Sequence, residues 1–133
     1  MSIVQTVLRF VLTRKVLRVT WLLAIVAVIV GSLLPPDSAP IRTLDLLPFS
    51  DKFDHMGMYA LLAFLPALHE ETRAVWWMAI GAVALGIALE FAQPYVRRDF
   101  EIGDMVADAL GVAVGLAAGL PLRKRIGKMM SGN

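Results

Sequence analysis

The sequence contains no cysteine, which excludes disulfide bonds, thiolate nucleophiles and cysteine-bound metals. It also lacks an HExxH zinc motif, a GxSxG nucleophile elbow and a glycine-rich loop for phosphate. No serine is accompanied by the partners of a catalytic triad, and no phosphatase-like set of Lys, Arg and two His is present. The enzyme classes that such motifs identify are therefore excluded.

Apolar residues dominate what is there. They make up 58% of the 133 residues, and the mean hydropathy of +0.69 is typical of a membrane protein. We expect one all-α domain over residues 1–133. The isoelectric point of 9.3 does not predict nucleic-acid binding, because the basic residues gather near the chain ends beside apolar segments and not on one soluble face.

Four apolar segments predict a bundle of four transmembrane helices. The first stops at Pro35-Pro36, and the second is the least apolar of the four. The short turn HEETR after the second segment forces an antiparallel return. The predicted spans are residues 17–34, 53–68, 74–93 and 102–122.

Residues 1–18 carry four basic side chains among apolar ones, which predicts a short interfacial helix on the lipid headgroups. A cleavable signal peptide is the alternative, since Ser38-Ala39 resembles a cleavage site after an apolar run. The paired prolines and Asp37 fit such a site poorly, and three further apolar segments follow. A membrane helix is therefore favoured.

Charge predicts the orientation. The N-terminal segment, the HEETR turn and the C-terminal tail hold nine Lys/Arg and two acids, a balance of +7, while the rest of the chain holds four Lys/Arg and nine acids, a balance of −5. The positive-inside rule then predicts a multi-pass protein of the cytoplasmic membrane with both termini in the cytoplasm. The acid-rich loops face outward.

Polar residues recur at helical spacing near the outer ends of the second and third predicted spans. Asp51, His55 and Tyr59 are four residues apart, so they share one helix face. Glu90 and Gln93 are three residues apart and share a face of the next span. Both sets are expected at a similar depth, near the outer boundary of the membrane.

The fourth span begins with Asp104 and Asp108, which lie on nearly the same helix face as a row of glycines. Such small residues let another helix approach closely. We expect the ends of the second, third and fourth spans to form an outward-facing polar pocket. Its available countercharges are Lys52, Arg97 and Arg98.

Each of these residues also has an ordinary structural explanation. Asp51, Asp54 and Asp104 suit the first turn of a helix, where the macrodipole favours acids. His55 and Tyr59 suit a hydrogen-bonded core, and the arginines suit the membrane interface. Glu90 is harder to explain, because a charge at membrane depth costs several kcal/mol unless it is paired or protonated. We therefore expect Glu90 to be functional or obligatorily ion-paired.

Together these residues resemble the VanZ-like family of small bacterial membrane proteins. The resemblance covers residues 45–120 and is carried by Asp51, Lys52, His55, Tyr59, Glu90, Gln93, Arg98, Asp104, Asp108, Gly111 and Gly115. The family often has asparagine where this chain has Asp108, which weakens any role that needs a neutral amide. Arg97 competes for the arginine position, and Arg98 is favoured.

The resemblance implies a role in the cell envelope related to glycopeptide (teicoplanin) resistance. In a first hypothesis the pocket binds an envelope lipid, or a lipid-linked or glycopeptide-type ligand, with Lys52 and Arg98 on a phosphate. In a second, Glu90 or Asp104 acts with His55 as general acid and base of a membrane enzyme. In a third, the charged residues form an ion-pair network that holds the helices together for a partner protein.

No cofactor is expected, although Asp51, His55, Glu90 and Asp104 are compatible with a divalent cation. Magnesium or calcium is favoured over zinc, because only one of the two histidines lies near the site. The expected partner is a membrane lipid, in particular a phosphorylated lipid carrier. A homo-oligomer is compatible with the sequence, and nucleic acid is not an expected partner.

Overall fold

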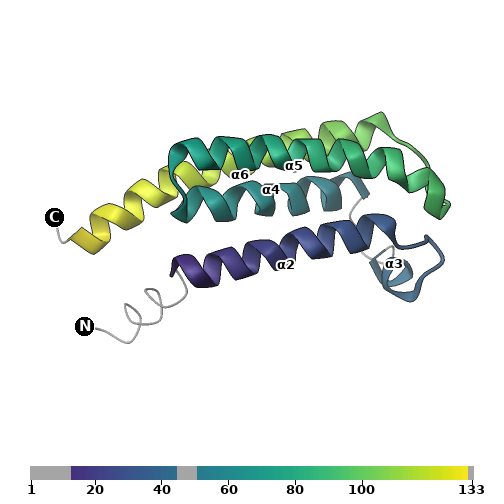
Figure 1. The fold of residues 1–133 in the computed structure, drawn as a ribbon, viewed down its shortest axis with the longest axis horizontal. Helices are drawn as coiled ribbons and strands as arrows, with labels where there is room; N and C mark the ends of the chain where they lie inside the picture. Colours follow the sequence, from purple (N-terminus) through teal and green to yellow (C-terminus); the bar gives the residue numbers. More distant parts are fainter. Residues whose placement is uncertain (1–12, 45–50, 132–133) are drawn as a thin grey trace.

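The computed structural model describes residues 13–44 and 51–131, and within these ranges all regular secondary structure is helical, with no strand (Figure 1). The elements are α2 (Arg14–Leu33), α3 (Ala39–Leu44), α4 (Asp51–His69), α5 (Thr72–Ala92), the 3-10 helix η1 (Gln93–Val96) and α6 (Ile102–Ser131). The all-α prediction is confirmed for this part of the chain.

Three helical stretches are long and apolar enough to cross a membrane, namely Arg14–Leu33, Thr72–Val96 and Ile102–Met129. They coincide with the first, third and fourth predicted spans. The predicted second span forms α4, a helix of 19 residues, but it does not reach the same apolar length. The reason is its first turn, which carries Asp51, Lys52 and Asp54.

Helix α4 lies at the centre of the bundle. It packs against α2, α5 and α6, and its contact with α6 is the most extensive in the molecule (Figure 1). The buried side chains of α4 are Tyr59, Leu62, Ala63, Leu65, Pro66 and Ala67. The three apolar helices therefore cover much of α4, so that Tyr59 is buried and His55 is largely covered, whereas Asp51 and Lys52 at its start are exposed.

The contact between α4 and α6 depends on the glycines of α6. A Cβ atom on Gly111 would collide with the carbonyl oxygen of Met56, and one on Gly115 would collide with that of Ala60. These backbones touch because glycine has no side chain. The predicted small-residue surface is confirmed.

A proline in α4 explains how α2 docks. Pro66 has no N–H group, so the carbonyl oxygen of Leu62, four residues earlier, receives no helical hydrogen bond. The indole Nε1 of Trp21 in α2 donates to this oxygen at 2.9 Å. The carbonyl group that Pro66 leaves without a helical partner in α4 is thus hydrogen-bonded by α2, as buried backbone groups require.

Several helices differ in extent from the predicted segments. Most of the expected interfacial helix, residues 1–12, lies outside the described residues, but Arg14 to Arg18 form the first turn of α2. Helix α3 lies in the connection between the first and second predicted spans. Helix α6 continues past the expected end at residue 122, through Pro121 and the basic tail, to Ser131.

Candidate functional site

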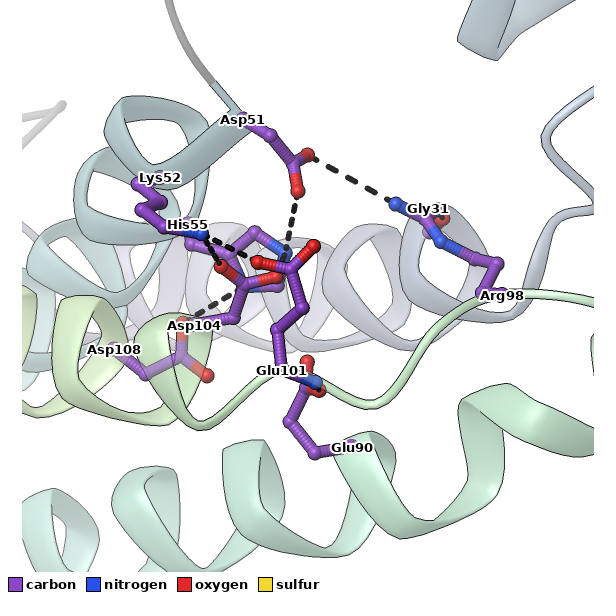
Figure 2. A network of polar contacts seen from close by, with 9 residues as sticks. All are labelled: Gly31, Asp51, Lys52, His55, Glu90, Arg98, Glu101, Asp104 and Asp108. Carbon is purple, nitrogen blue, oxygen red and sulfur yellow. Dashed lines mark hydrogen bonds and ion pairs between the residues drawn. The ribbon is translucent and has the colours of Figure 1, made fainter.

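His55 is the centre of a polar cluster between α4 and α6 (Figure 2). Its Nδ1 lies 3.0 Å from Asp108 Oδ1. Its Nε2 lies 3.7 Å from Asp104 Oδ2 and 4.0 Å from Asp51 Oδ2. Because residues four apart share a helix face, Asp51 and His55 on α4 are opposite Asp104 and Asp108 on α6. The two predicted polar stripes therefore meet.

Two permanent cations contact this cluster from its edges. Lys52 Nζ lies 2.6 Å from Glu101 Oε2 and 2.9 Å from Asp104 Oδ1. Arg98 donates from Nη1 to the carbonyl oxygen of Gly31 at 3.2 Å, and its Nη2 lies 3.9 Å from Asp51 Oδ1. We call this set the His55 cluster: Asp51, Lys52, His55, Glu90, Arg98, Glu101, Asp104 and Asp108. It holds five carboxyl groups against two permanent cations.

Glu90 is a deeply buried member of the His55 cluster. Its residue surface is 1% exposed, and Oε2 accepts a hydrogen bond from the Glu101 N–H at 3.0 Å. The other oxygen, Oε1, has no partner. The side chain extends from α5 toward Glu101 and Asp104 (Figure 2). Among the described residues no cation forms an ion pair with Glu90, so the ion pair considered as one explanation for this residue is not observed.

Tyr59 and Asp108 are also buried, and both lie against Gly86 of α5. A Cβ atom on Gly86 would collide with Asp108 Oδ2 and would lie 3.1 Å from Tyr59 Oη. Gly86 therefore makes space for the cluster. Sequence reasoning missed it, and its only signal was a glycine in an apolar run.

The adjacent arginines point to different places. Arg97 has a left-handed backbone (φ 63°), and its exposed side chain lies 3.1 Å from Asp37. Arg98 is turned inward with a side chain 16% exposed, and its N–H donates to the carbonyl oxygen of buried Gln93 at 3.2 Å. Arg98 therefore joins the cluster and Arg97 does not.

A cavity of about 400 Å³ opens beside the His55 cluster. Polar groups at its edge are Asp51, Asp54, His55 and Arg98, and its apolar wall includes Ala27, Val28, Ile41, Phe53 and Met58. The polar residues at the ends of the second, third and fourth predicted spans come together as expected. The cavity beside them is lined by α2, α4, Ile41 and Arg98, so α2 contributes a wall that the sequence did not predict.

A second cluster of charges lies where α4 joins α5. Arg18 donates to both carboxylate oxygens of Glu70, from Nε at 2.5 Å and from Nη2 at 3.1 Å. Arg14 lies 3.8 Å from the same carboxylate, and Arg123 donates to the Glu70 carbonyl oxygen. The hydrogen bonds from Arg18 lower the pKa of Glu70. We call this set the Glu70 cluster.

The arrangement around His55 can hold a cation or transfer protons. Asp51, His55 and Asp104 each offer one ligand atom, and these three atoms lie within 4.8 Å of one another.

No protein-family model, curated protein or solved structure matches the chain. The VanZ-like resemblance stays a prediction from the residues. A function must therefore be inferred from the two clusters and the cavity.

Proposed function

We propose that the protein is a multi-pass protein of the cytoplasmic membrane, in which α4 is a fourth spanning helix shielded by the other three. The length of α4 supports this, since 19 residues at ~1.5 Å each approach the ~30 Å of a hydrocarbon core. The basic Glu70 cluster lies at one end of α4 and the acid-rich His55 cluster at the other. By the positive-inside rule the termini are then cytoplasmic and the His55 cluster faces outward.

The cavity in this proposal binds an envelope lipid or a lipid-linked envelope precursor. The observation that carries the proposal is an apolar wall next to a polar edge that includes Arg98. A lipid chain fits against Ala27, Val28 and Met58, and a headgroup fits at the edge. Such a combination is typical of sites that bind amphiphilic ligands.

Arg98 is the residue that meets the phosphate. A guanidinium group has five N–H donors in a planar fork, which suits a phosphate better than a lysine does. The distance of 3.9 Å to Asp51 is too long for a hydrogen bond, so this contact leaves Nη2 able to donate to a ligand. Arg98 belongs to the His55 cluster, whereas Arg97 pairs with Asp37 outside it.

The test compares the two arginines. The wild type, Arg98→Ala and Arg97→Ala are purified in mild detergent, and the retained lipids are identified by native mass spectrometry and lipid extraction. We expect the wild type and Arg97→Ala to retain the same phosphorylated lipid class, and Arg98→Ala to lose it. Equal retention by all three proteins, or lipids in the same proportions as the bulk membrane, would contradict the proposal.

A structural role for the His55 cluster is the second candidate, and the contacts from α4 to α6 favour it. Lys52 pairs with Asp104, and His55 pairs with Asp108, so each pair connects these two helices. Exchanging Lys52 and Asp104 for each other keeps that pairing while it changes the site. The exchanged protein is compared with the two single variants, Lys52→Asp and Asp104→Lys. If the exchange restores both stability and lipid retention, the structural role is favoured. If it restores stability without lipid retention, a binding site is favoured.

A further inference from the structure

We propose that Asp51, His55 and Asp104 bind a divalent transition-metal ion at the edge of the cavity. Figure 2 shows the three side chains converging from α4 and from the start of α6. The ligand atoms are Asp51 Oδ2, His55 Nε2 and Asp104 Oδ2. This site goes beyond lipid binding and requires no lipid.

The distances suit shared ligation better than direct hydrogen bonding. His55 Nε2 is 3.7 Å from one carboxylate oxygen and 4.0 Å from the other, beyond the ~3.2 Å limit of a good N–H to oxygen hydrogen bond. Ligands bound at ~2.1 Å to one metal are separated by roughly 3–3.6 Å. Small side-chain rotations therefore close the three atoms around an ion.

A hydrogen-bonded partner orients two of the three ligands, and a cation lies beside the third. Asp108 lies 3.0 Å from His55 Nδ1, so it accepts a hydrogen bond from that nitrogen and leaves the lone pair of Nε2 free. Lys52 holds the other oxygen of Asp104 at 2.9 Å, and Arg98 lies beside the other oxygen of Asp51. A carboxylate that orients a histidine through its second nitrogen is a recurring feature of metal sites.

Glu90 supplies an independent indication that a cation binds here. It is almost completely buried, one of its oxygens has no partner, and its side chain points toward Glu101 and Asp104 (Figure 2). Asp104 and His55 are close enough to act on it electrostatically. A buried carboxylate in a cluster that already has excess acid is costly, and a divalent cation nearby offsets that cost.

The ligand types narrow the choice of metal. Magnesium and calcium prefer oxygen ligands only, whereas an imidazole nitrogen suits first-row transition metals. Two carboxylates with one imidazole therefore favour Mn²⁺ or Zn²⁺. The sequence favoured magnesium or calcium over zinc, and the preference changes because the imidazole of His55 is one of only three converging ligands.

The test uses the metal alone. Delipidated protein is titrated with MnCl₂, and the loss of the free Mn²⁺ signal is followed by electron paramagnetic resonance, with Zn²⁺ as competitor. We expect one bound ion per chain, and nitrogen modulation from one imidazole in the spin-echo spectrum of the wild type. Asp108→Asn is expected to weaken binding roughly 10–100-fold, the range typical for groups that orient a ligand. His55→Gln and Asp104→Asn are expected to weaken it more.

Asp99→Asn is the matched control, because it removes an exposed carboxylate near Arg98 that does not contact the three ligands. It is expected to bind the metal as the wild type does. Absence of binding by the wild type, absence of nitrogen modulation, or equal weakening by Asp99→Asn and Asp104→Asn would overturn the site. The spin-echo result needs no variant, so it holds even where a substitution prevents folding. Since no lipid is present, failure here leaves the lipid proposal standing.

Discussion

The two polar clusters at opposite ends of α4 differ in how their charges are matched. In the Glu70 cluster a single buried carboxylate receives both hydrogen bonds of Arg18, and Arg14 and Arg123 surround it. In the His55 cluster five carboxyl groups share two permanent cations. One oxygen of Glu90 there has no partner at all.

This difference separates a structural contact from a candidate site. Stability is served by pairing every buried charge, because a buried group without a partner costs free energy. The Glu70 cluster fulfils that requirement. The His55 cluster keeps more acid than its cations compensate, and it borders a cavity, which is the combination expected where a ligand supplies the remaining contacts.

The largest expected effect comes from breaking the contact that supports both clusters. Gly115→Ala places a Cβ against the carbonyl oxygen of Ala60, where no flexible side chain can move aside. The free energy of unfolding should fall by about 3 kcal/mol, the upper part of the range for overpacking. Loss of helical circular dichroism during SDS titration measures it. Gly81→Ala, with open space around its Cβ, should not destabilise, and equal effects of the two variants would contradict the prediction.

The second prediction contrasts the clusters directly. Glu70→Gln removes the charged acceptor of Arg18, so it should destabilise, though less than Gly115→Ala. Glu90→Gln should leave the free energy of unfolding unchanged or raise it, since it removes a buried negative charge that has no ion-pair partner among the described residues. The same SDS titration compares them. A larger loss for Glu90→Gln than for Glu70→Gln would mean that the His55 cluster is the more important structural contact.

The smallest expected effect is the pH dependence of the Glu70 cluster. Because the pKa of Glu70 is lowered in the folded protein, its stabilising contribution is complete above the unfolded value of ~4.3 and is lost as the pH falls through the folded pKa. The stability difference between the wild type and Glu70→Gln should therefore shrink toward pH ~3. Glu71→Gln, which removes an exposed neighbour, should show no such trend. If the stability difference between the wild type and Glu70→Gln stayed constant with pH, the prediction would be contradicted.

Helix periodicity accounts for what could be predicted from the sequence. The apolar runs predicted α2, α5 and α6 as long apolar helices, although α6 extends further than expected. The spacing of four placed Asp51 with His55 and Asp104 with Asp108 on single helix faces. These features depend on local spacing, which a sequence contains.

The rest depends on which helices are neighbours. Ala27 and Val28 look like lipid-facing residues of an apolar run, and only the position of α2 makes them a cavity wall. The choice between Arg97 and Arg98 depends on one left-handed residue in a turn. The space that Gly86 leaves for Asp108 and Tyr59 likewise arises only after α5 packs on α4 and α6.

The hydrogen bond from Trp21 to Leu62 also fixes the position of α2 along α4. In a regular helix every carbonyl is hydrogen-bonded within the helix, so a neighbouring helix finds no preferred turn. Pro66 leaves one carbonyl of α4 free, and Trp21 donates a hydrogen bond to it. Sliding α2 by one turn, about 5.4 Å, would lose that bond and would carry Gly31 away from Arg98. A proline near one end of α4 thus helps to set the position of the cavity wall at the other end.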